Sequence, residues 1–384
     1  MSDDFSTLDA LTVSERSFAV YRIPGQSPVL QVQEEGLPEA FDTVAELNGR
    51  SGFVMAPFQS NVSHPVVLIR SDVSVHGKSQ ILRYLKKWVS ADAAKATVGS
   101  SIVATGASIT TNEAPITANG TSITAAIAGY TIYKGAFELF LKALHAGSCE
   151  KIVLSRTMQL PLPSGFSAGT LFGAACETYP DAFVYLCHTP LTGTWFGSTP
   201  ELLLSGENGS WQTVALAGTR RIKDSEAGWD AKNIREQQVV TAYLEKQLRI
   251  KNLIGSISEP YTVRAGQLMH IKTDFRFEMP DQGCVGDLLD FLHPTPAVCG
   301  YPKSEACRLI LAHEGYDRSY YSGFAGPMNM DGKTDLYVNL RCAQMTDKGL
   351  VLYAGGGLMP DSELKSEWEE TEVKLQTLLA LIQE

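Results

Sequence analysis

The chain has 384 residues, of which 44% are hydrophobic, and a formal net charge of −10 at pH 7. This is the composition of a soluble globular protein, and the acidic balance without any basic run argues against nucleic acid as a partner. No apolar segment is long enough to cross a membrane. The N-terminus lacks the features of a signal peptide, and the seven cysteines are scattered without a C-x-x-C pair, so we expect a cytoplasmic protein with free thiols.

The expected elements begin with short strands near 18–22 and 66–70. Residues 93–129 are rich in Ala, Thr, Ser and Gly, which predicts a long, flexible surface loop between two halves of the chain. Beyond it we expect helices at 130–146, 231–250, 304–313 and after 361, and strands at 151–156, 183–187, 194–197, 201–205, 211–216, 336–343 and 350–353. Hairpins separated by helices predict an α+β fold rather than a parallel sheet.

The C-terminal stretch combines a glycine turn with an acidic helix. The three glycines at 355–357 follow an apolar strand and let the backbone approach a ligand without Cβ atoms in the way. On the helix, one face carries Glu363, Glu367, Glu370 and Lys374 at i, i+4, i+7 and i+11. This stripe is either a solvated face with i,i+4 pairs or an oxygen-ligand site for a hard cation, beside a turn that holds an anionic substrate.

Two residues are candidates for acid–base chemistry. Lys151 begins a strand of alternating pattern; a lysine in a dry pocket can act as a general base, whereas the alternative is a surface lysine at a strand start. Glu201 follows an aromatic strand and a turn and precedes a run of leucines. A carboxyl group in such a place can stay protonated and act as a general acid, and the alternative is a loop glutamate that caps a turn.

Three other places carry groups that bind ions. The stretch from Ala217 to Arg221 leaves a strand at Gly218 with donors for carboxylates, unless it is a basic turn in solvent. Arg341 lies within an apolar hairpin, where a buried arginine needs an anionic partner, whereas on a half-exposed strand it would face water. Glu236 is either a second metal ligand or a solvated helix glutamate.

The stretch Gly165-Phe-Ser-Ala-Gly169 matches the G-x-S-x-G pattern of a hydrolase nucleophile, with Ser167 at its centre. Such an elbow needs a strand directly before the serine, but Pro161, Pro163 and Ser164 interrupt it. We interpret the stretch as a loop and a helix N-cap. The hydrolase alternative predicts ester hydrolysis that depends on Ser167.

Together these stretches resemble the chorismate-utilising enzymes, which include isochorismate, salicylate, anthranilate and aminodeoxychorismate synthases. The resemblance runs in the family's order over 130–384, whereas residues 1–129 are divergent. The matching motifs are Lys151-Ile-Val-Leu-Ser-Arg156, Gly197-Ser-Thr-Pro-Glu-Leu-Leu203, Leu216-Ala-Gly-Thr-Arg-Arg221, Arg235-Glu-Gln-Gln-Val-Val240, Leu292-His-Pro-Thr-Pro-Ala-Val298, Tyr321-Ser-Gly323, Leu340-Arg-Cys-Ala343 and the stretch from Tyr353 to Lys374. The resemblance implies one catalytic domain over residues 1–384, with large, mainly antiparallel sheets packed together and helices outside.

The resemblance also implies a role for each candidate residue. Lys151 would deprotonate a water that attacks C2 of chorismate, and Glu201 would protonate the departing C4 hydroxyl group. The implied cofactor is Mg²⁺, held by Glu236 and Glu370 with Glu367 beside them, and bound to the ring carboxylate. The implied substrate-binding residues are Gly355, Gly357 and Lys374 at the ring carboxylate, Gly218 and Thr219 in the lining, Tyr321 and Arg341 at the enolpyruvyl carboxylate, and His270 and Ala297 near the ring.

Within the family, three features favour isochorismate synthase. A lysine nucleophile of the aminodeoxychorismate type would stand where this chain has Ala217, and Lys151 favours water over ammonia as the nucleophile. Ala297 and Val298 look more like isochorismate synthases than salicylate synthases, which tend to carry threonine where this chain has Ala297. We therefore hypothesise a Mg²⁺-dependent isomerase, an isochorismate synthase. The alternatives are a salicylate synthase or a non-catalytic relative that binds chorismate-like anions.

Two positions depart from the family pattern. Gln237 stands where a histidine is usual, and Asn233 replaces an acidic residue one turn before Glu236, which thins the carboxylates around the metal. The expected partner is the small molecule chorismate, and the expected assembly is a monomer or weak homodimer. Whether the product serves menaquinone, siderophore or salicylate synthesis stays open.

Overall fold

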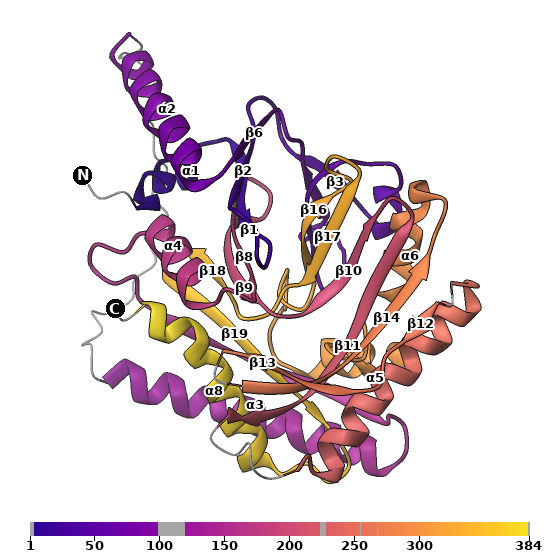
Figure 1. Ribbon diagram of the computed structural model, residues 1–384. Coiled ribbons are helices and arrows are strands. Elements are labelled where there is room, and N and C mark those ends of the chain that lie inside the picture. Colours follow the sequence, from indigo (N-terminus) through magenta and orange to yellow (C-terminus); the bar gives the residue numbers. More distant parts are fainter. Residues whose placement is uncertain (1–3, 99–119, 223–227, 254, 267, 383–384) are drawn as a thin grey trace.

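The computed structural model describes residues 4–98, 120–222, 228–253, 255–266 and 268–382. Within these residues, the strands form two large sheets that face each other, and helices lie on the outer sides of both (Figure 1). Neighbouring strands pair in antiparallel register in both sheets. The expected α+β architecture with large antiparallel sheets is therefore confirmed.

The first sheet has nine strands in the described residues, and strands that are far apart in the sequence lie side by side in it. In spatial order the strands are β15 (Gly300–Tyr301), β7 (Lys151–Leu160), β19 (Gly349–Leu358), β18 (Cys342–Thr346), β9 (Gly193–Thr199), β8 (Phe183–Thr189), β1 (Ser17–Arg22), β2 (Val29–Gln33) and β6 (Val73–His76). The register of β7 and β19 pairs Val153 with Gly357, so the three glycines at 355–357 lie within β19, beside the strand that begins at Lys151. The turn expected at these glycines is therefore wrong, because β19 continues to Leu358.

The second sheet has ten strands in the described residues, of which β13 (Tyr261–Ala265) pairs only with β14. The others are, in spatial order, β12 (Ser256–Ile257), β14 (Leu268–Glu278), β11 (Ser210–Arg221), β10 (Leu202–Glu207), β17 (Lys333–Val338), β16 (Phe324–Met328), β4 (Gly52–Ala56), β5 (Val66–Ile69) and β3 (Glu39–Phe41). Strands from the first 76 residues thus complete one end of both sheets, while the single-domain organisation over the whole chain stays a prediction.

The helices in the described residues cover the outer faces. They are α1 (Asp9–Thr12), α2 (Lys78–Val98), α3 (Gly120–His145), α4 (Ala168–Thr178), α5 (Ala231–Ile250), α6 (Val285–Leu292), α7 (Lys303–His313) and α8 (Leu364–Ile382), with 3-10 turns η1 (Phe5–Leu8), η2 (Val44–Leu47) and η4 (Gln282–Cys284). Figure 1 shows α4 and α8 outside the nine-stranded sheet and α5 and α6 outside the ten-stranded sheet. None of the described helices has the length and apolar composition needed to cross a bilayer.

The expected loop over 93–129 is wrong at both ends, because α2 extends to Val98 and α3 begins at Gly120. The middle of the expected loop, 99–119, lies outside the described residues. Alanine is the strongest helix former, so an Ala-rich segment with few large apolar residues can be helical although it lacks a clear buried face. The shortage of large apolar residues was the signal that misled the sequence interpretation.

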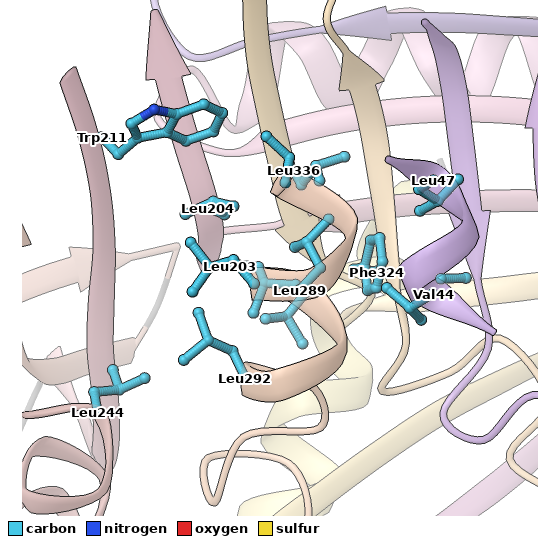
Figure 2. Packing of buried hydrophobic residues seen from close by; sticks show 14 of the residues in the cluster. Val44, Leu47, Leu203, Leu204, Trp211, Leu244, Leu289, Leu292, Phe324 and Leu336 are labelled. Carbon is cyan, nitrogen blue, oxygen red and sulfur yellow. The ribbon is translucent and has the colours of Figure 1, made fainter. Parts of the chain in front are cut away.

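The core consists of an aromatic layer between the sheets and apolar layers beneath the outer helices. Between the sheets, Phe183 stacks on Tyr337 with ring centroids 4.4 Å apart. On the outer face of the ten-stranded sheet, Figure 2 shows Leu289 and Leu292 of α6 packed toward Leu203 of β10. This packing fixes the end of α6 and therefore the loop that follows it, which carries Ala297 and Val298.

Two chain crossings between the sheets position the site. Glu201 lies where the chain passes from β9 in the first sheet to β10 in the second. Arg341 lies where the chain returns from β17 to β18. Two backbone hydrogen bonds join the crossings. The Val338 amide donates to the Glu201 carbonyl at 2.9 Å, and the Ser198 amide donates to the Arg341 carbonyl at 3.0 Å.

Candidate active site

A cavity of about 640 Å³ is lined by residues from both sheets. Its lining includes every predicted substrate-binding residue, together with two of the predicted catalytic and metal-binding residues: Gly218, Thr219, His270, Ala297, Tyr321, Arg341, Gly355, Gly357 and Lys374, with Glu201 and Glu236. The other three predicted residues, Lys151, Glu367 and Glu370, do not line this cavity but are in contact with residues that do. The structure therefore brings the predicted residues into one region, while their roles stay predictions.

Glu201 is buried at the crossing between β9 and β10, with 5% of its surface exposed, so it is not a solvent-facing loop residue. Burial raises the pKa of Glu201 to about 7, although the positive charges of Lys151, Lys374 and Arg341 act to lower it. A carboxyl group with this pKa holds its proton at neutral pH in a large fraction of molecules. This is the property that a general acid needs.

Arg341 is buried rather than facing water, and its backbone has a φ of 47°. Its Nη1 atom is buried without a hydrogen-bond partner in the described residues. Burial lowers the pKa of Arg341 to about 10, opposed by Tyr321, Glu370 and Glu201, so the guanidinium remains charged at neutral pH. An unpaired buried cation in a cavity is a binding group for an anion, and a carboxylate fits the planar guanidinium.

Lys151 is fully buried, which excludes the alternative of a surface lysine. Its Nζ atom lies 3.1 Å from Oε1 of Glu236, close enough for an ion pair. The contact lacks hydrogen-bond geometry, and Nζ has no hydrogen-bond partner in the described residues. The amino group is therefore available to hydrogen-bond a ligand.

Gly357 explains how Lys151 and Glu236 come so close to the backbone of β19. A Cβ atom at this position would lie 2.2 Å from Oε1 of Glu236 and 2.6 Å from Cε of Lys151. Both distances are far below van der Waals contact, so only glycine fits. The close approach of backbone that the three glycines predict is therefore present, and side chains of this protein occupy the space.

His270 lines the cavity in its neutral form. Burial, together with the charges of Arg341 and Lys374, lowers the pKa of His270 to about 3. Its Nδ1 lies 2.9 Å from the carbonyl oxygen of Gly218, so Nδ1 carries the proton and donates to that oxygen. The other ring nitrogen, Nε2, is then an acceptor, and it is buried without a partner in the described residues.

The three predicted metal-binding glutamates are each paired with a lysine. Glu236 is paired with Lys151 at 3.1 Å, Glu367 with Lys232 at 2.5 Å and Glu370 with Lys374 at 2.6 Å. Lys374 also donates to the carbonyl oxygen of Gly355 at 2.7 Å. Because Glu367 is 1% exposed, the acidic stripe of α8 is not a solvated face at this position.

The Glu367 and Glu370 carboxyl groups share an acidic environment but differ in protonation. Burial raises the pKa of Glu367 to about 7, with Lys232 lowering it and the Glu370 charge raising it. The Glu370 side chain is 19% exposed; its partial burial acts to raise its pKa, but Lys374 and Lys232 outweigh this and bring the pKa of Glu370 to about 2. Both residues line a second cavity of about 1,240 Å³, which shares Thr219 with the first.

The residues present fit a hard cation. The Glu367 Oε2 atom is buried without a partner in the described residues. That atom and Oε1 of Glu370 each lie 3.2 Å from the position that a Cβ on Gly356 would take, so both face one point. The described residues hold no ready-made group of three His, Cys, Asp or Glu ligands. Carboxylate oxygens in small number suit Mg²⁺, which keeps several of its waters and binds few protein ligands.

The two departures from the family pattern have local structural roles. The Asn233 Oδ1 atom accepts a hydrogen bond from the Thr219 amide at 2.9 Å, which holds the turn that lines the cavity. The Gln237 side-chain amide donates to Thr273 on β14 at 2.8 Å. Ser167, the centre of the hydrolase pattern, caps α4: its hydroxyl oxygen accepts from the Thr170 amide at 3.0 Å.

Sequence reasoning missed two sets of residues that support the site. Lys232 stands four residues before Glu236 on α5, and this i,i+4 spacing was the available signal. Glu314 and Arg318 form a buried ion pair beneath β7. The pair has i,i+4 spacing, but its burial depends on contacts with Val153, Ser155 and Val298, which are far away in the sequence.

Comparisons with known proteins relate this site to one family. A family model described as "Chorismate binding enzyme" matches residues 57–383. Isochorismate synthase EntC of Escherichia coli is 31% identical over 242 residues, which are 60% of this chain and 61% of that relative. The salicylate biosynthesis isochorismate synthase of Pseudomonas aeruginosa is 32% identical over 248 residues, 62% of this chain and 52% of that relative. These alignments span less than two thirds of either relative.

A solved structure extends the likeness to almost the whole chain. The structure of MenF, the menaquinone-specific isochorismate synthase of Escherichia coli, covers 99% of this chain and 91% of its own, with a TM-score of 0.71. At 21% sequence identity this match shows a shared fold.

Proposed function

Because this chain belongs to the chorismate-binding enzyme family, we propose that it is an isochorismate synthase, which converts chorismate to isochorismate. The observation that carries the proposal is the presence in one site of two buried groups suited to acid–base chemistry, Lys151 and Glu201. The two relatives described above are isochorismate synthases by name, which supports the same choice.

In the proposed reaction Lys151 removes a proton from a water molecule whose oxygen forms a bond to C2 of the substrate ring. The ring double bonds shift, the bond from C4 to its hydroxyl oxygen breaks, and Glu201 gives its proton to the departing hydroxyl group, which leaves as water. One water enters and one leaves, so the product is an isomer of the substrate. The pKa of Glu201, about 7, suits this donation at neutral pH.

The proposed substrate contacts follow from the charges of the cavity. Arg341, with its unpaired Nη1 atom, would bind the enolpyruvyl carboxylate together with Tyr321. His270 would accept a hydrogen bond from the substrate through Nε2. Lys374 and the backbone of Gly355 and Gly357 would hold the end of the substrate that carries the ring carboxylate.

The proposed cofactor is Mg²⁺. Glu236 and Glu370 would hold it, with Glu367 beside them. When bound, it would neutralise the ring carboxylate and strengthen substrate binding.

The test is to incubate purified protein with chorismate and Mg²⁺ and to separate the products by chromatography. Isochorismate alone, lost in Glu201→Gln and Lys151→Ala, would support the proposal. Salicylate with an equal amount of pyruvate would make the protein a salicylate synthase. No turnover, with chorismate still bound, would leave a binding protein and overturn the proposal.

A further inference from the structure

The carboxylate cluster formed by Glu236, Glu367 and Glu370 has as many lysines as glutamates. In each of the three carboxyl groups, Oε1 lies within 3.1 Å of a lysine Nζ atom. The lysines thus offset the charge of the carboxylates without any metal. A divalent cation that enters this cluster must overcome the repulsion of the ammonium groups already there.

The three lysines are held in different ways. Lys151 is fully buried, and Lys374 makes a second hydrogen bond, to the carbonyl oxygen of Gly355. Lys232 has a 19% exposed side chain and borders the larger, second cavity. Its hydrogen bond and ion pair within the cluster are to Glu367. Of the three amino groups, that of Lys232 is therefore the one best placed to turn toward solvent.

Glu367, the partner of Lys232, has one carboxylate oxygen that accepts hydrogen bonds and one that is available for a cation. Glu367 Oε1 is bound by Lys232 and by the Ser362 hydroxyl, which donates at 2.7 Å. Glu367 Oε2 is buried without a partner in the described residues and faces the same point as Oε1 of Glu370. A buried carboxylate oxygen without a partner is unfavourable, so this oxygen is suited to bind a cation that the structure does not contain.

We propose that Lys232 is a built-in cation that neutralises the cluster when no metal is bound and competes with Mg²⁺ for it. This inference rests on the proposed function for the identity of the metal, but its test measures binding. Lys232 lowers the affinity for Mg²⁺, and in return it keeps Glu367 paired in the metal-free protein. Metal binding then displaces the Lys232 ammonium group toward the second cavity.

The variant Lys232→Met removes the charge and keeps an unbranched side chain that favours helix. We expect its dissociation constant for Mg²⁺, measured by calorimetry on metal-free protein, to be lower by about tenfold or more, because one nearby positive charge is gone. Lys232→Arg retains the charge and should bind Mg²⁺ as the unchanged protein does. Lys246→Met, at an exposed position of the same helix, is the matched control and should have no effect.

Thermal unfolding provides a readout that does not depend on activity. In a chelator, Lys232→Met should melt at a lower temperature than the unchanged protein, because Glu367 loses its partner. Added Mg²⁺ should raise the melting temperature of Lys232→Met by more than that of the unchanged protein. If Lys232→Met is too unstable to purify, Lys232→Gln serves for the same two measurements.

The outcomes separate this inference from the proposed function. Equal or weaker Mg²⁺ binding by Lys232→Met would overturn the inference, since Lys232 would then be neutral toward the metal or would help to position Glu367 for it. Absence of Mg²⁺ binding in every variant would overturn it as well. The product formed from chorismate decides the proposed function independently of these affinities.

Discussion

At the scale of single residues, the environments of Glu201 and Arg341 suit the roles proposed for these side chains. Both are buried at chain crossings, and burial acts on both in the direction that disfavours charge. For Glu201 this retains a proton near neutral pH, and for Arg341 it leaves a charged group without enough partners. Under the proposed function, Glu201 would thus be ready to donate a proton and Arg341 to bind an anion.

The pKa of Glu201 leads to a pH prediction. A general acid must carry its proton, and the protonated fraction of Glu201 falls as the pH rises through about 7. We expect kcat/KM for chorismate to be level below that pH, until other groups titrate, and to fall by about tenfold per pH unit above it. Glu201→Gln should lose this descending limb together with most of its activity. A limb that persists in Glu201→Gln would assign it to another group.

Gly357 gives a second prediction at this scale. In Gly357→Ala the new Cβ collides with Glu236 and Lys151, and both must move. A displacement of about 1 Å in a catalytic group lowers turnover by about 100-fold, so we expect a loss of that order in kcat. Gly135→Ala on α3 is the matched control, because a Cβ there meets nothing within 4 Å. Normal turnover by Gly357→Ala would show that the Lys151–Glu236 contact is not needed.

At the scale of elements, a buried ion pair connects three segments beneath the cavity. The Arg318 guanidinium binds Glu314 at 2.6 Å and donates to the carbonyl oxygens of Val298, at 2.8 Å, and of Val153, at 2.9 Å. The same Glu314 accepts from the Ser155 amide at 2.7 Å. The pair therefore ties β7 to the loop that follows α6 and to the segment before β16, and Val153 and Val298 both line the cavity.

Removing one partner of this pair should be costly. Arg318→Met leaves the Glu314 charge buried and unpaired, and we expect the free energy of unfolding in urea to fall by about 3–5 kcal/mol. The exposed pair Glu305–Arg308 on α7 is the control. There Arg308→Met should change the free energy by less than about 1 kcal/mol. A loss of similar size in both variants would mean that Arg318 does not act through its burial.

At the scale of the whole molecule, the sequence predicted features that depend on short local patterns, and it missed features that depend on contacts between distant segments. Most of the strands and the motif residues of the cavity are local patterns, and the structure places the motif residues together. The turn expected at the three glycines and the single strand expected over 336–343 are wrong, because β19 continues through the glycines and the chain changes sheets between β17 and β18. The Ala-rich segment around 93–129 was misjudged, because helix propensity and the lack of a buried face point in opposite directions there. Lys232 was missed because its partner, Glu367, comes from α8, far away in the sequence.

The crossings between the sheets also bear on how the protein becomes active. Glu201 and Arg341 lie on different crossings between the sheets. Lys151 and Glu236 come from β7 and α5. The cavity therefore forms only when both sheets are folded and packed together. Contacts between segments far apart in sequence form late and slowly during folding. We therefore expect chorismate turnover to return in the slowest phase of refolding from urea, after secondary structure measured by circular dichroism. Recovery of activity would then report when the whole molecule has finished folding.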